Sequence, residues 1–131
     1  MSGDAAAFKV VSESDVPVSS SDPAKFTGDV SQAEILPAVR AEGLRGHRFS
    51  YRPGARSNWH VHTGEQALVV VHGQGLVQWK GLGEPKVLKP GDWVHVQPGV
   101  AHWHGATADS DFVHLAITAS GVTEWGEPVT E

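Results

Sequence analysis

Turn signals recur at short, regular intervals from residue 44 to residue 118, and this spacing limits the fold more than any other feature. The chain of 131 residues has 15 glycines and 8 prolines, and many of them sit between short alternating or β-branched runs. These runs cover residues 44–51, 67–72, 76–80, 93–96, 102–105 and 112–118. Short strands at such spacing predict an antiparallel sandwich or barrel, and no long helical period competes with them.

The two ends of the chain differ from this central part. Residues 1–25 are rich in Ser, Ala and Asp and predict an arm with one edge strand around residues 8–11. Residues 31–40 are ambiguous, because Pro37 interrupts any helix there. We expect one barrel over residues 26–118 and a tail over residues 119–131 that packs back on its outside.

Composition excludes several classes of function. The formal net charge is -5 and no basic block is present, so nucleic acid is an unexpected partner. The chain has no cysteine, which excludes disulfides and thiolate ligands. No apolar stretch approaches a membrane span, and the N-terminus lacks a basic region before its apolar residues. We therefore expect a cytoplasmic protein that acts on a small molecule.

The eight histidines all lie between His47 and His114, and their spacing suggests a metal site. His60 and His62 stand two apart, which places both imidazoles on one face of a strand. Gln66 has the same parity, and His102 follows a distant Pro-Gly turn. Two donors from one strand and one from another can converge inside a barrel. Imidazole with a neutral oxygen donor suits first-row divalent metals.

The glycines around these histidines extend the pattern. The first stretch has Gly54, His60, His62, Gln66 and Gly73 at the spacing of the first motif of the cupin family. The second runs from Gly91 through Pro98-Gly99 to His102 and resembles the second cupin motif. Gln66 stands where that family usually has glutamate, while Gln97 and Ala106 replace a usual proline and asparagine.

The resemblance implies an all-β, single-domain cupin, which is a jelly-roll barrel also called a double-stranded β-helix. It also implies one divalent metal on His60, His62, Gln66 and His102; we expect manganese first, with Fe, Ni, Co, Cu and Zn as alternatives. The segments around these residues are most similar to small bacterial cupins that act as metal-dependent hydroxynitrile lyases. Such a lyase cleaves a cyanohydrin into an aldehyde and cyanide, reversibly. A dioxygenase, a polyketide cyclase and a non-catalytic ligand-binding cupin remain open alternatives.

Three further histidines are candidate catalytic residues. His104 lies two residues after His102 and is expected to share its inward face, where it would act as general base. His114 faces inward only if Val113 and Leu115 are covered from outside, which favours a homodimer. His47 shares parity with Phe49 and Tyr51 on the more apolar face of its strand. His72 and His95 are expected to be structural.

Overall fold

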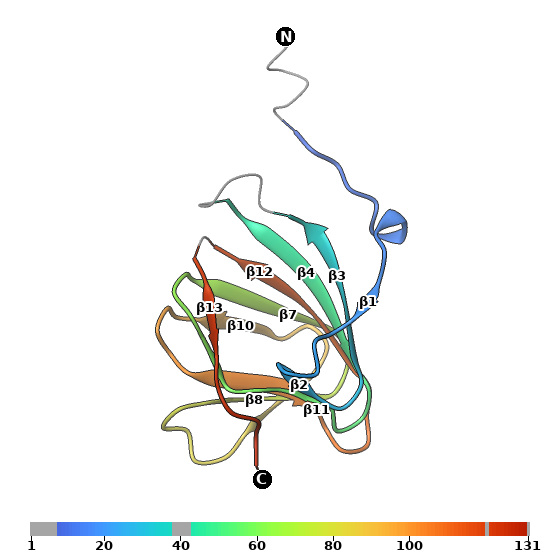
Figure 1. Ribbon diagram of the computed structural model, residues 1–131. Helices are drawn as coiled ribbons and strands as arrows, with labels where there is room; N and C mark the ends of the chain where they lie inside the picture. Colours follow the sequence, from blue (N-terminus) through green and yellow to red (C-terminus); the bar gives the residue numbers. More distant parts are fainter. Residues whose placement is uncertain (1–7, 38–42, 120, 131) are drawn as a thin grey trace.

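The computed structural model describes residues 8–37, 43–119 and 121–130 as two antiparallel sheets that face each other (Figure 1). The first sheet has the strand order β1-β3-β4-β12-β7-β10. Its strands are β1 (Ser19–Ser20), β3 (Val30–Leu36), β4 (Arg45–Tyr51), β12 (Phe112–Thr118), β7 (Gln66–Gly73) and β10 (Trp93–Val96). The all-β prediction is confirmed.

The second sheet has the order β13-β6-β11-β5-β2, and β8 joins β9 to the free edge of β11. Its strands are β13 (Thr123–Trp125), β6 (His60–His62), β11 (His102–Ala106), β5 (Arg56–Ser57), β2 (Phe26–Thr27), β8 (Gly75–Trp79) and β9 (Lys86–Leu88). Gly105 allows β11 to pass close to β5, because a Cβ there would lie 2.5 Å from the carbonyl oxygen of Ala55.

The strands predicted from residue 44 onward are present, whereas the edge strand predicted around residues 8–11 is absent. Residues 8–11 form no strand; a short 3₁₀ helix (Glu13–Asp15) follows, and the first strand is β1. In the ambiguous segment 31–40, residues up to Leu36 belong to β3, which pairs with β4 along most of its length, and residues 38–40 lie outside the described residues. Residues 1–7 of the predicted arm lie outside the described residues.

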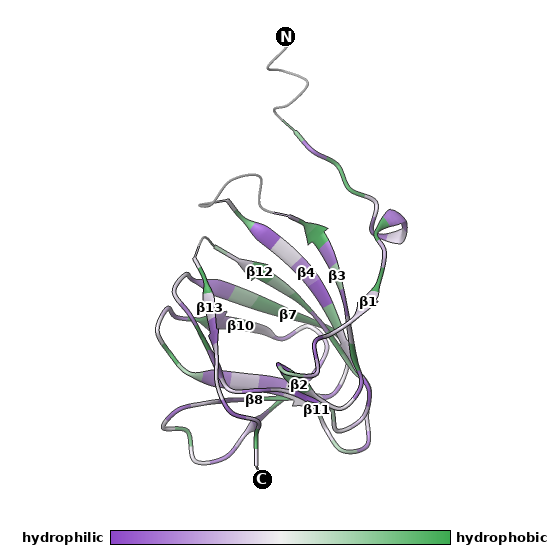
Figure 2. Ribbon diagram, viewed as in Figure 1, coloured by the Kyte–Doolittle hydropathy of each residue, from purple (hydrophilic) through white to green (hydrophobic). Residues whose placement is uncertain are grey.

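Rows of side chains cross the inner face of the first sheet, because directly opposed residues of antiparallel strands share a face. One row joins Gln66, Thr118 and Arg45, and the next joins Leu68, Ala116 and His47. Polar residues thus interrupt an otherwise hydrophobic set of strands, as Figure 2 shows for β4 and for β11 in the opposite sheet. These rows and β11 enclose the site described below.

A register shift in β7 explains where His72 lies. His114 pairs with Val70, but Val113 pairs with His72, so β7 carries one extra residue at this point. The shift reverses the alternation, and His72 is exposed on the outer face although its position in the sequence has the parity of Gln66. Among the described residues, no helix is long and apolar enough to cross a membrane.

Candidate metal centre and its cavity

Three imidazoles converge between β6 and β11. His60 and His62 project from the same face of β6, and His102 is the cross-strand partner of His60. One ring nitrogen from each of the three lies within 4.8 Å of the other two. All three side chains are buried. The structure therefore brings together the three histidines that the sequence selected, and they form a cluster able to hold a metal ion.

The outer nitrogen of each ring has a fixed partner. Nδ1 of His60 donates to the carbonyl oxygen of Asn58 at 2.8 Å, and Nδ1 of His102 donates to that of Val100 at 2.9 Å. Nδ1 of His62 lies 2.9 Å from the Thr123 hydroxyl. With Nδ1 as the donor, Nε2 carries the lone pair, which is the arrangement that metal-binding histidines need. Nε2 of His62 and Nε2 of His102 are buried without a hydrogen-bond partner in the described chain.

Gln66, which the sequence predicts as a fourth ligand, lines the cavity beside the cluster and has a neutral oxygen available. Its Nε2 donates to the Thr118 hydroxyl at 3.0 Å, which assigns the other amide position to oxygen. That oxygen, Oε1, is buried and has no hydrogen-bond partner among the described residues. Buried polar atoms are rarely left unsatisfied, so these orphaned atoms fit a divalent cation. All four donors are neutral, so an ion held by them keeps its full charge.

Burial keeps these imidazoles neutral. It lowers the pKa of His60 well below 6.5, and the neighbouring His102 lowers it further. Burial and then His102 lower the pKa of His62 to about 4, with a smaller effect from Arg45. Burial also lowers the pKa of His102. Since only the neutral ring can bind a metal, all three histidines are ready to bind at neutral pH.

A hydrogen-bonded chain lies beside the cluster. The hydroxyl of Tyr51 is 2.8 Å from Nδ1 of His104 and 3.1 Å from Nε2 of His114. Nδ1 of His114 donates to the carbonyl oxygen of Leu115 at 3.2 Å, so its Nε2 must accept from Tyr51. The Tyr51 oxygen then accepts from Nδ1 of His104. This assignment leaves the lone pair of His104 on Nε2.

Burial keeps all three groups of this chain uncharged. Burial, followed by the nearby histidines, lowers the pKa of His104 well below 6.5, and burial lowers the pKa of His114 to about 4. Burial raises the pKa of Tyr51 well above 10. At neutral pH the chain therefore consists of two neutral imidazoles and one protonated phenol. His104 in this state can accept a proton.

A cavity of about 580 Å³ opens beside the cluster. His60 and His62 of the cluster line it together with Gln66 and His104, whereas His102 is absent from the lining. Phe26, Phe49 and Trp125 form an apolar wall of the cavity. Because Trp125 belongs to β13, the C-terminal tail lines the cavity as well as packing on the barrel. His114 points inward but is absent from this lining and lies behind His104 with Tyr51.

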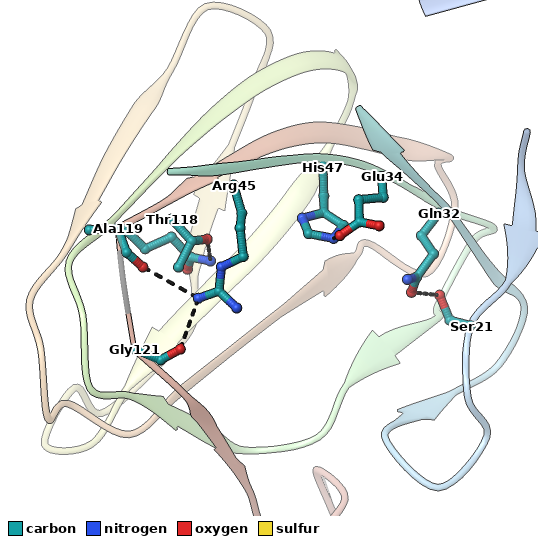
Figure 3. Close-up of polar contacts among 9 residues, drawn as sticks. Ser21, Gln32, Glu34, Arg45, His47, Thr118, Ala119 and Gly121 are labelled. Carbon is teal, nitrogen blue, oxygen red and sulfur yellow. Dashed lines mark hydrogen bonds and ion pairs between the residues drawn. The ribbon is translucent and has the colours of Figure 1, made fainter. Parts of the chain in front are cut away.

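His47 and Arg45 lie on the opposite wall of the cavity, on β4 (Figure 3). Nε2 of His47 is 3.8 Å from the Glu34 carboxylate. Burial lowers the pKa of His47, Glu34 raises it by less, and Arg45 lowers it slightly. The sequence thus placed His47 on the correct face. His72 is exposed, and His95 is also exposed and bonded to Glu65.

Sequence reasoning missed three residues that organise the site: Tyr51, Thr118 and Thr123. Tyr51 shares strand parity with His47, and a hydroxyl on an inward apolar face was the available signal. Thr118 ends a predicted strand at the parity of His114. Thr123 lies in the tail, and nothing near it in the sequence indicates that it would meet His62.

Comparison with known proteins decides the family. A family model described as a cupin domain matches residues 47–118, more than half of the chain. The chain is a cupin. It is 37% identical over 109 residues to an (R)-mandelonitrile lyase from Granulicella tundricola, a match that covers 81% of this chain and 82% of the lyase. The resemblance to hydroxynitrile lyases predicted from sequence is confirmed.

Solved structures support the same family. A cupin-like protein from Thermotoga maritima superposes with a TM-score of 0.82 at 36% identity, over 86% of this cupin and 87% of that chain. A polyketide cyclase from Streptomyces resistomycificus gives a TM-score of 0.73 at 15% identity, over 95% and 88% of the two chains. At that identity the cyclase shares the fold only.

Proposed function

We propose that this cupin is a metal-dependent carbon–carbon lyase that cleaves a cyanohydrin into an aldehyde and cyanide, reversibly. The observation that carries the proposal is the position of His104. This neutral imidazole lines the same cavity as His60 and His62 of the cluster, and its Nδ1 is hydrogen-bonded to Tyr51. The 37% identity to an (R)-mandelonitrile lyase supports the choice of reaction.

His60, His62, Gln66 and His102 would hold the metal, for which manganese is our first expectation. A divalent ion there would act as a Lewis acid that lowers the pKa of a bound hydroxyl. The four neutral ligands leave the positive charge of the ion available for this effect. Their outer hydrogen bonds to Asn58, Thr123, Thr118 and Val100 would fix the direction of each donor atom.

His104 acts as the general base in this proposal. Its Nε2 takes the proton of the substrate hydroxyl, the bond between the carbinol carbon and the nitrile carbon breaks, and its electron pair leaves with cyanide. The oxygen keeps its electrons in the new carbonyl of the aldehyde. The protonated His104 then returns the proton to cyanide, so hydrogen cyanide and aldehyde are the products and the ring is neutral again.

Tyr51 and His114 are positioning residues in this scheme. Because His114 accepts from Tyr51, the Tyr51 oxygen is free to accept from Nδ1 of His104, which holds the basic nitrogen on the cavity side. His47 is a second candidate base, but it lies beside Glu34 on the opposite wall. We therefore assign the proton transfer to His104.

The test is turnover of mandelonitrile by manganese-loaded protein, followed as benzaldehyde formation against a blank without protein. His104→Ala should keep wild-type metal content and lose about 10²- to 10⁴-fold in rate, the usual effect of removing a general base. His95→Ala is the matched control, because His95 is an exposed histidine outside the cavity.

Two results would contradict the proposal. One is a metal-loaded wild type that cleaves no cyanohydrin but consumes oxygen with a flavonol or cyclises an aromatic polyketide. The other is a His104→Ala protein with full metal content and undiminished cyanohydrin cleavage. In the second case the proton must leave by another group.

A further inference from the structure

Arg45 places a positive charge in the wall of the cavity. It lies on β4 and lines the same cavity as His60, His62 and Gln66. It is also the third member of the cross-strand row that begins at Gln66 and passes through Thr118. With strands about 4.8 Å apart, the Cα atoms of Gln66 and Arg45 are separated by about 10 Å. The long arginine side chain therefore extends over the same space that Gln66 faces.

The guanidinium of Arg45 is held in place from one side only. Its Nη2 donates to the carbonyl oxygens of Ala119, at 3.3 Å, and Gly121, at 3.2 Å. Figure 3 shows the second terminal nitrogen directed away from these two carbonyls. Two neutral carbonyls fix the orientation but leave the charge uncompensated. Nε and Nη1 make no hydrogen bond within the described part of the chain.

The other charged groups near the cavity each contact a group other than Arg45, and none of these contacts compensates the charge of Arg45. Glu34 faces His47 at 3.8 Å. Asp22 accepts a hydrogen bond from the backbone of Ala24, and the Lys25 ammonium lies 5.5 Å from the ring centre of Trp125. None of the ion pairs among the described residues involves Arg45, whereas Arg48 on the same strand pairs with Glu13.

We infer that Arg45 is the binding site for a carboxylate carried by the substrate of this cavity. The planar guanidinium presents parallel N–H donors that match the two oxygens of a carboxylate. A monoanion fits better than a phosphate dianion, because Glu34 and Asp22 add negative charge near the same cavity. An anionic ligand would also offset the charge of an ion on the four neutral donors.

This inference deepens the proposed function and rests on it, because both take this cavity as the substrate site. For the lyase reaction it names a cyanohydrin whose aldehyde portion carries a carboxylate. Arg45 would bind that carboxylate, and the hydroxyl and nitrile would lie toward His104 and the four donors. The apolar wall of Phe26, Phe49 and Trp125 would contact the carbon skeleton between them.

The experiment measures binding without turnover, by calorimetry on manganese-loaded protein with succinate and succinamate. Each compound can bind the metal through a carboxylate at one end. The other end is a second carboxylate in succinate and a neutral amide in succinamate. Having two equivalent ends favours succinate by a statistical factor of about 2. A carboxylate bound to Arg45 should raise the preference to about 10-fold or more, because charge-assisted hydrogen bonds are the stronger ones.

Arg45→Gln should reduce the preference to about 2-fold, and Arg45→Lys should keep part of it, since lysine is a point charge without the planar donor pair. Arg48→Gln is the matched control: it removes the same charge from the same strand outside the cavity and should leave the preference unchanged. A merely structural role of Arg45 in holding residues 119 and 121 would weaken both ligands equally.

A wild-type preference of about 2-fold, or a larger preference that survives Arg45→Gln, would overturn the inference. Circular dichroism and metal analysis of each variant separate misfolding from lost recognition, and Arg45→Lys gives the answer if the glutamine variant does not fold. Failure of the lyase proposal would leave the succinate preference intact. Failure of the carboxylate inference would leave mandelonitrile cleavage intact.

Discussion

The substitution Tyr51→Phe tests the hydrogen-bonded chain, because it removes one oxygen atom and keeps the ring. Tyr51 is the only tyrosine in the chain and is 1% exposed. Its ring packs against Phe112 and His114, with centroids 5.6 and 5.5 Å away, and phenylalanine can keep these contacts. The effect of the substitution therefore comes from the two hydrogen bonds of 2.8 and 3.1 Å.

The expected loss of stability comes from two ring nitrogens that lose their hydrogen-bond partner. Nδ1 of His104 and Nε2 of His114 would each remain buried without a partner. An orphaned buried polar group costs about 1 to 3 kcal/mol, so we expect the free energy of unfolding to fall by about 2 to 4 kcal/mol, with some relaxation included. Turnover should fall by about 10- to 100-fold, as for other outer-shell residues that orient a site.

Urea unfolding near neutral pH, followed by tryptophan fluorescence, measures the first effect, and the rate on mandelonitrile measures the second. Ser21→Ala serves as control, because it removes a hydroxyl that bonds the Gln32 side chain at 2.8 Å in a partly buried position. That control should cost about 1 kcal/mol or less. A Tyr51→Phe protein as stable as the control and with wild-type turnover would refute the assigned chain.

Three further predictions concern the metal, the pH and the assembly. Thr118→Val removes the acceptor that orients the Gln66 amide and should weaken metal affinity by about 10- to 100-fold in a competition titration with a chelator. Burial lowers the pKa of His114 to about 4, whereas the pKa of a histidine in the unfolded chain is about 6.5, so the unfolded state binds more protons between these two pH values. His114 alone should therefore destabilise the metal-free protein by about 3 kcal/mol as the pH falls from about 6.5 to about 4. Urea unfolding midpoints across that range will measure the effect. On the outer face of the first sheet, Trp93 is 71% exposed and lies in register with Val69 and Leu115. Because such an exposed hydrophobic patch is typical of an interface, we expect a homodimer, and light scattering should give twice the chain mass of 13.9 kDa.

The sequence was most informative where local periodicity decides the outcome. Alternation within one strand put His60 and His62 on one face, and the turn before His102 started a second strand at a predictable place. Gly73 marks a turn that sequence reasoning used correctly: its φ is 76°, and a Cβ there would lie 1.8 Å from the carbonyl oxygen of Asp111. Such constraints act over a few residues and can be inferred from one chain.

Contacts across the barrel were beyond this reasoning. Parity placed Tyr51 on a face but could not show that its hydroxyl would meet His104 and His114, which lie 53 and 63 residues away. The register shift in β7 reversed the direction of His72, and no turn residue announces it. The tail was expected to pack on the barrel, but the sequence could not show that β13 pairs with β6 and brings Thr123 to His62. Each of these depends on long-range strand register.

The most direct test of the metal centre is anomalous X-ray diffraction at the absorption edge of the metal that elemental analysis finds in the purified protein. We predict one peak per chain, at about 2 Å from Nε2 of His60, His62 and His102 and from Oε1 of Gln66. A peak bound elsewhere, or a metal-loaded protein in which Gln66 turns its oxygen away from the three imidazoles, would contradict the account.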